Sequence, residues 1–92
     1  MSLLVKQTNS FAKAMKKLSK QQKKELDIAV KAIMQDPDIG ERKKGDLSFL
    51  RVYKFKMNKK LTLLGYCYEE DRLILTLLKL GSHENFYRDM KR

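Results

Sequence analysis

A histidine and a tyrosine near the C-terminus are the side chains best suited to chemistry. His83 is the single histidine of the chain, and Tyr87 follows it by four positions. If this stretch is a helix, the two side chains lie one turn apart on the same face. An imidazole exchanges protons near neutral pH, so the pair is the start of a nucleic-acid-processing site. The plainer alternative, in which His83 is a surface residue and Tyr87 a packing anchor, explains the pattern equally well.

A second group of candidates lies in residues 47–68, which contain five basic residues and no acidic one. Lys54 and Lys56 alternate with apolar residues at strand spacing, so they project from the same face as Leu50 and Val52. Ammonium groups clustered beside apolar side chains are expected to have lowered pKa values and to stabilise phosphate charge. A strand face that is charged only for solubility is the alternative.

Two arginines complete the candidates that can be chosen from pattern alone. Arg51 is a weaker candidate, because strand alternation places it on the opposite face from Lys54. Arg88 follows Glu84 by four positions, so it can form a helix salt bridge with that carboxylate or hold a phosphate.

The composition indicates a basic protein with a polyanionic partner. The 92 residues are expected to form one domain, 1–92, with 21 Lys and Arg against 11 Asp and Glu and a net charge of +10. This excess predicts attraction to nucleic acid, with an acidic protein or an anionic membrane surface as alternatives. The sequence lacks a membrane-spanning stretch and a cleaved-signal pattern, so a cytoplasmic location is expected.

Metal or cofactor chemistry is not expected from this sequence. One cysteine and one histidine provide too few soft ligands for a zinc site of the usual type, and there is no glycine-rich phosphate loop. Cys67 lies in an apolar strand-like run and is expected to be a buried, reduced thiol.

The first half of the chain predicts a strand and two helices. Residues 3–5 form a short apolar run, and apolar residues recur at helical spacing over residues 11–18. A second helix begins at a capping box in residues 19–22 and ends at Asp36-Pro37. The tight connection predicts an antiparallel helical hairpin.

The second half predicts a sheet. Residues 37–48 indicate a surface loop, and three strand-like runs then follow at 50–57, 61–68 and 72–80. Short polar turns between them predict an antiparallel meander. We therefore expect an α+β fold in the order β-α-α-β-β-β-α, with the helical hairpin on an antiparallel sheet and a short C-terminal helix.

This order of elements resembles the RelE/ParE family of bacterial toxins. The resemblance extends over essentially the whole chain, and its motifs are Tyr53-Lys54-Phe55-Lys56-Met57 and the segment from Gly81 to Tyr87. It implies a toxin of a type II toxin–antitoxin system that is bound by a cognate acidic antitoxin, with assemblies of higher order. RelE-type members cut mRNA in the ribosomal A site without a metal, by attack of the 2′-hydroxyl. ParE-type members instead inhibit DNA gyrase by binding.

The candidate residues favour cleavage. The resemblance implies that His83 is a general acid or base, that Lys54 and Lys56 stabilise the phosphorane, and that Tyr87 positions the RNA. RelE-type toxins carry an arginine on the next strand and another after the strand-exit glycine. Here residues 61–66 have no basic side chain, and a histidine follows the glycine. Lys59 and Lys60 in the preceding turn can supply the missing positive charge.

The main expectation is therefore a ribosome-dependent mRNA endoribonuclease that needs no cofactor and has no membrane partner. A gyrase-binding toxin without enzymatic activity is the first alternative. A non-toxic basic module that binds RNA or DNA is the second.

Overall fold

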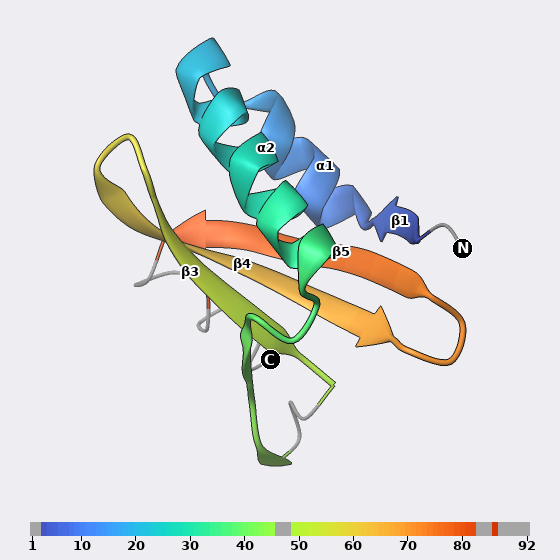
Figure 1. Ribbon diagram of the computed structural model, residues 1–92. Coiled ribbons are helices and arrows are strands. Elements are labelled where there is room, and N and C mark those ends of the chain that lie inside the picture. The colour runs from blue at the N-terminus through green and yellow to red at the C-terminus, as the bar shows by residue number, and fades with distance from the viewer. Residues whose placement is uncertain (1–2, 46–48, 83–85, 87–92) are drawn as a thin grey trace.

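Two helices pack on one face of a five-stranded mixed sheet, as Figure 1 shows. The computed structural model describes residues 3–45, 49–82 and 86. The elements follow the chain in the order β1 (Leu4–Gln7), α1 (Asn9–Lys16), α2 (Lys20–Gln35), β2 (Glu41–Arg42), β3 (Arg51–Met57), β4 (Lys60–Glu69) and β5 (Ile74–Ser82). The predicted α+β class is confirmed.

Both helices begin after a residue whose side chain caps the first turn. The Thr8 hydroxyl accepts a hydrogen bond from the Phe11 N–H at the start of α1. Ser19 and Gln22 form the predicted capping box at the start of α2, each side chain accepting from the backbone N–H of the other residue. Helix α2 ends at Asp36, directly before Pro37.

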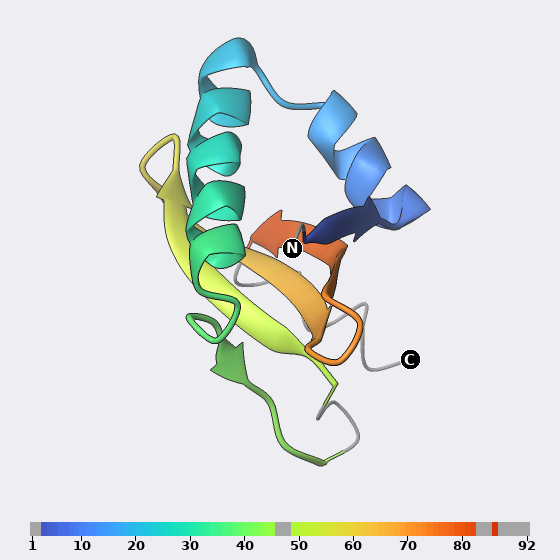
Figure 2. The same ribbon diagram turned by 45° about the vertical axis from the view of Figure 1, so that its right-hand side comes forward.

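The two helices are splayed over the sheet (Figure 2). Helix α1 lies against β5 and helix α2 lies against β3. A groove of about 330 Å³ separates them, with Leu77 of β5 and four helical apolar side chains in its lining. These four residues are Phe11, Met15, Leu26 and Val30.

The sheet has the strand order β1-β5-β4-β3-β2, and two expectations about it are wrong. Strand β1 pairs with β5 in parallel, so the sheet is mixed rather than antiparallel. Residues 37–48 are not only a loop, since β2 pairs with β3 through Glu41–Val52 and Arg42–Arg51. A strand of two residues is too short to show alternation, and its pairing depends on a distant partner. The predicted C-terminal helix lies outside the described residues except for Phe86.

Apolar side chains fill both faces of the sheet. The helical side holds the larger cluster, which includes Phe11, Ile33 and Tyr66. The other side holds a smaller cluster whose buried members are Leu50, Val52, Leu63 and Phe86. The candidate site lies around this smaller cluster.

Candidate functional site on the uncovered face of the sheet

Lys54 and Lys56 lie on the sheet face that the helices leave uncovered. Lys54 is the cross-strand partner of Leu63, which belongs with Val52 to the smaller cluster. Tyr53, in contrast, packs into the cluster on the helical side. Lys54 and Lys56 are both exposed on the face that carries the smaller apolar cluster, and phosphate binding by them stays a prediction.

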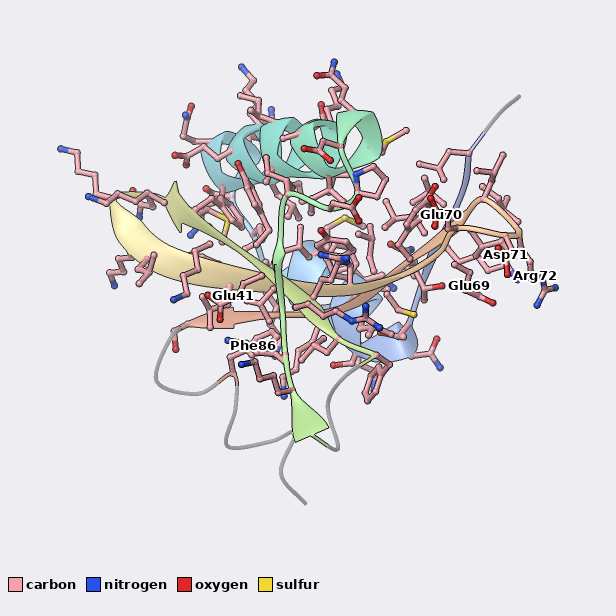
Figure 3. The ribbon with its side chains drawn as sticks, turned by 60° about the horizontal axis from the view of Figure 1, so that its bottom comes forward. Glu41, Glu69, Glu70, Asp71, Arg72 and Phe86 are labelled. Carbon is pink, nitrogen blue, oxygen red and sulfur yellow. The ribbon has the colours of Figure 1, made fainter. Side chains whose placement is uncertain are left out.

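Phe86 is buried on this same face. Its side chain is completely buried against Leu50, Val52 and Leu63, and Figure 3 shows it on the far side of the sheet from α2. The ring fits because residue 65 of β4 is a glycine. A Cβ atom at Gly65 would lie 2.6 Å from the Phe86 Cζ, which is closer than side chains tolerate. The space above Gly65 therefore serves as the socket for the Phe86 ring, and it is called the Gly65 socket.

His83, Tyr87 and Arg88 lie outside the described residues, so their roles stay predictions. In the sequence, His83 precedes Phe86 by three positions and Tyr87 directly follows it. Phe86 itself is buried on the face that carries Lys54 and Lys56.

Glu41 is a third ionisable group at this face, and the sequence interpretation missed it. Its register partner on β3 is Val52, so its side chain projects to the uncovered side with that residue. Lys43 Nζ donates a hydrogen bond of 2.9 Å to Glu41 Oε1. This hydrogen bond, the charge of Lys43 and the more distant charge of Lys54 lower the pKa of Glu41. An ionised carboxylate thus lies within the electrostatic field of Lys54.

No local pattern in the sequence marks Glu41. It reaches the site only because β2 pairs with β3, and the residues around it resemble a charged loop. The site can therefore combine an ionised carboxylate with two ammonium groups that neutralise phosphate charge.

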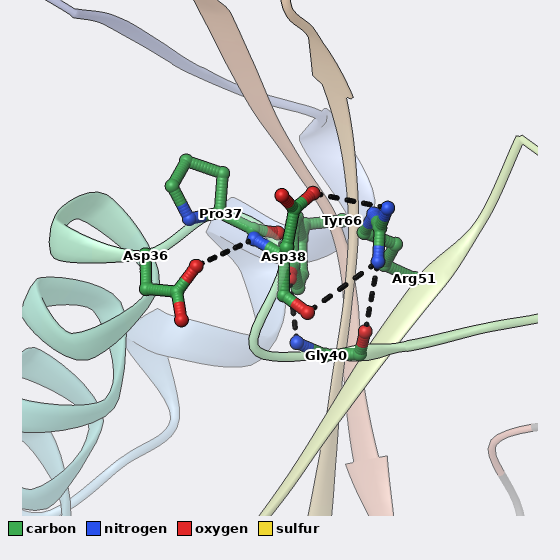
Figure 4. A network of polar contacts seen from close by, with 6 residues as sticks. All are labelled: Asp36, Pro37, Asp38, Gly40, Arg51 and Tyr66. Carbon is green, nitrogen blue, oxygen red and sulfur yellow. Dashed lines mark hydrogen bonds and ion pairs between the residues drawn. The ribbon is translucent and has the colours of Figure 1, made fainter.

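A buried tyrosine fixes the loop that leads into β2 (Figure 4). The Tyr66 hydroxyl accepts a hydrogen bond of 2.9 Å from the Gly40 N–H and donates one to the Pro37 carbonyl. Burial raises the pKa of Tyr66 and so favours the neutral, donating phenol. A Cβ atom at Gly40 would lie 2.7 Å from the Tyr66 hydroxyl oxygen, so only glycine allows this approach. The loop in turn places Glu41.

Arg51 braces the same loop from β3. Its guanidinium forms an ion pair of 3.0 Å with Asp38 and donates a hydrogen bond of 3.1 Å to the Gly40 carbonyl. Its cross-strand partner is Tyr66, which packs on the helical side, so the predicted separation from Lys54 is confirmed. RNA binding by Arg51 stays a prediction, and it would require this ion pair to open.

Lys59 and Lys60 lie where β3 turns into β4, next to Lys56. Asn58 and Lys59 have φ values of 54° and 66°, as a two-residue hairpin turn of type I′ requires. The Asn58 N–H donates a 3.0 Å hydrogen bond to Glu25 of α2, which fixes the turn against the helix. Both lysine side chains are exposed, and RNA binding by them stays a prediction.

Cys67 is half-buried rather than fully buried as expected, and this partial burial raises the pKa of its thiol. Among residues 3–45, 49–82 and 86, no group of three His, Cys, Asp or Glu side chains is arranged to hold a metal ion. No helix in the same residues is both long and apolar enough to cross a bilayer.

Comparison with solved structures shows the same fold. The free E. coli toxin RelE, in a mutant form, superimposes with a TM-score of 0.73 at 17% identity, over 98% of this chain and 93% of that one. The toxin of the intact E. coli RelBE complex gives 0.70 at 16% identity, over 88% and 96%. The RelBE2 toxin–antitoxin complex of Mycobacterium tuberculosis gives 0.69 at 14% identity, over 90% and 100%.

The sequence itself matches a family model. No curated protein is significantly similar to the chain. The model of the ParE-like toxins of type II bacterial toxin–antitoxin systems, however, matches residues 5–91. This match spans nearly all of the chain, including the candidate site. The chain therefore belongs to the family of ParE-like toxins of type II bacterial toxin–antitoxin systems.

Proposed function

We propose that this toxin is a metal-independent endoribonuclease that cuts mRNA on the ribosome. The observation that carries the proposal is the lysine-bearing face itself, where the exposed Lys54 and Lys56 lie beside an apolar cluster that buries Phe86. His83 precedes Phe86 by three positions in the sequence, and a titratable side chain near a basic surface is what RNA cleavage needs.

The reaction follows from the chemistry of the 2′-hydroxyl. A base takes its proton, the oxygen attacks the adjacent phosphorus, and the bond to the 5′-oxygen breaks. An acid protonates the departing oxygen, which leaves a 2′,3′-cyclic phosphate and a 5′-hydroxyl. Lys54 and Lys56 neutralise the extra charge on the phosphorane. His83 serves as acid or base, and Tyr87 positions the RNA.

We also propose an acidic antitoxin as the partner of this toxin. Two of the structures with the same fold are toxin–antitoxin complexes. The groove between α1 and α2 offers an apolar floor that includes Phe11, Leu26 and Leu77. An amphipathic acidic segment that folds on binding suits the groove, and its extension can cover the basic sheet face. Higher-order assemblies with this antitoxin, and a cytoplasmic location shared with ribosomes, belong to the same proposal.

Expression in a bacterial host tests the proposal against its alternatives. His83→Ala and Lys54→Ala should each abolish growth arrest while circular dichroism shows a folded protein. Lys44→Ala is the matched control, since it removes an exposed lysine outside the site. A folded His83→Ala protein that still arrests growth and induces DNA damage signalling would favour gyrase inhibition. Harmless expression of the unaltered chain would favour the binding module.

A further inference from the structure

The positive charge of the chain is concentrated in its first 24 residues. This segment contains seven of the 21 basic residues and no acidic one, because the first carboxylate is that of Glu25. The rest of the chain has 14 basic and 11 acidic residues, which leaves only +3 of the net +10. Six of the seven lysines lie on the two helices and their connection, and together they are called the hairpin lysine cluster: Lys13, Lys16, Lys17, Lys20, Lys23 and Lys24.

The hairpin lysine cluster consists of two matching stripes. On each side of the connection, three lysines occupy positions i, i+3 and i+4, which share one face of a helix. All six side chains are exposed. None of them contributes to the four ion pairs found among the described residues. The acidic side chains of the sheet gather instead in the β4–β5 turn, at Glu69, Glu70 and Asp71 (Figure 3).

This arrangement opposes helix stability. Helix α2 has no acidic residue in its first turn and begins with Lys20, Lys23 and Lys24. The positive end of the helix dipole repels cations, and like charges at i and i+4 repel each other. Folding alone therefore favours other residues at these positions. A bound anion would reverse the sign of both effects.

We infer that the hairpin lysine cluster binds the phosphate backbone of duplex RNA, at a surface separate from the candidate active site. The cluster contains neither arginine nor an aromatic residue, whereas protein interfaces are enriched in both and depleted in lysine. Insertion into a membrane is disfavoured because the apolar sides of the helices are used against the sheet, through Phe11, Leu26 and Ile33. Lysines act as point charges on phosphate and need no particular base sequence.

The two basic surfaces lie on opposite sides of the sheet. The hairpin lysine cluster is on the helical side, and Lys54 and Lys56 are on the uncovered side. A short single strand bound at Lys54 therefore does not reach the cluster. If the toxin acts on the ribosome as proposed, the RNA on the helical side is ribosomal RNA. Only this identification rests on the proposed function, whereas binding of duplex RNA does not. The cluster would then hold the toxin on the ribosome while the opposite face receives the mRNA.

The experiment compares two variants with the same net charge. The cluster variant replaces three lysines of the cluster with glutamine: Lys20, Lys23 and Lys24. The control variant makes the same replacement at Lys31, Lys44 and Arg72. Binding of a perfectly paired RNA hairpin is measured from about 0.05 to about 0.3 M salt. Each lost phosphate contact should make the slope of the logarithm of the association constant against log salt shallower by about 0.9. We expect the cluster variant to lose about 2 to 3 units of slope and roughly tenfold to a hundredfold in affinity near 0.15 M salt. The control should resemble the unaltered chain.

Further arms separate the alternatives. A short single-stranded RNA should bind both variants equally, and the melting temperature of the cluster variant should not fall, because its substitutions relieve repulsion at the start of α2. Equal hairpin affinity and slope in the two variants would overturn the inference. Polyglutamate serves as a probe for an acidic protein partner, and a cluster variant that loses only polyglutamate binding would also overturn the inference. An unaltered chain that binds a DNA duplex of the same sequence more tightly than the RNA hairpin would overturn it as well. This assay measures binding and not cleavage. Its result therefore tests the lysine cluster even if the protein proves not to be a nuclease.

Discussion

Removing the Phe86 ring should abolish its docking on the uncovered face of the sheet. Burying a phenylalanine side chain contributes up to about 3 kcal/mol, and Phe86 is completely buried. Since about 1.4 kcal/mol corresponds to a factor of ten, Phe86→Ala should lower the docking equilibrium at this position roughly a hundredfold. Phe86→Leu keeps most of the apolar contact and should cost less than about 1.5 kcal/mol.

The effect should appear in catalysis more than in global stability. The larger apolar cluster lies on the opposite side of the sheet and does not include Phe86. We expect kcat/KM for mRNA cleavage on ribosomes to fall at least tenfold in Phe86→Ala and only slightly in Phe86→Leu. Circular dichroism should show that both variants keep their secondary structure.

Gly65 provides the matching perturbation from the other side of the contact. In Gly65→Ala the new Cβ would lie 2.6 Å from the Phe86 Cζ and 3.1 Å from the Leu50 Cδ1, so the ring must leave its socket. Such overpacking typically costs about 1–3 kcal/mol. Once the ring is absent, the added methyl group should do little further harm, so the double variant should lose less activity than the sum of the single losses. Full activity in a folded Phe86→Ala protein, or additive effects in the cycle, would refute this reasoning.

The remaining predictions concern Glu41, Tyr66 and Lys56. The stabilisation from Glu41 is present above its unfolded pKa of about 4.5 and is lost as the pH falls through its lower folded pKa. The melting temperature of the unaltered chain should therefore exceed that of Glu41→Gln at neutral pH, and the gap should shrink as the pH falls below 4.5; a constant gap would contradict the lowered pKa. Tyr66→Phe leaves the buried Gly40 N–H without its acceptor and should cost about 1–3 kcal/mol in urea unfolding. Because the folded pKa of Tyr66 is raised, the unaltered chain should lose stability as the pH rises through 10, and Tyr66→Phe should lose less. Lys56→Gln should leave the melting temperature unchanged, since the side chain is exposed, but weaken single-stranded RNA binding and its salt dependence. Unchanged RNA affinity at low salt would exclude Lys56 from the binding surface.

The sequence predicts those parts of the fold that depend on local pattern. Alternation along β3 is enough to separate Lys54 from Tyr53, because successive side chains point to opposite faces wherever the strand pairs. The start of α2 is predictable for a similar reason, since the side chains of Ser19 and Gln22 accept hydrogen bonds from one another's backbone, three residues away.

Features that depend on distant partners could not be predicted in this way. The parallel direction of β1 is set by its pairing with β5, about 70 residues later in the chain. Glu41 belongs to the site through a strand of two residues. The need for glycine at position 65 is visible only once Phe86 occupies the space above it. Each of these is a contact between segments whose own sequences do not reveal the partner.

Primer extension on an mRNA positioned in purified ribosomes tests the central claim most directly. The unaltered toxin and His83→Ala are compared in a buffer that keeps the ribosomes intact, and a free 5′-hydroxyl is assayed on the downstream product. The proposal predicts a new cut in the A-site codon that disappears with His83→Ala. The absence of any cut by the unaltered toxin, in a preparation that arrests growth in cells, would contradict it and direct attention to gyrase.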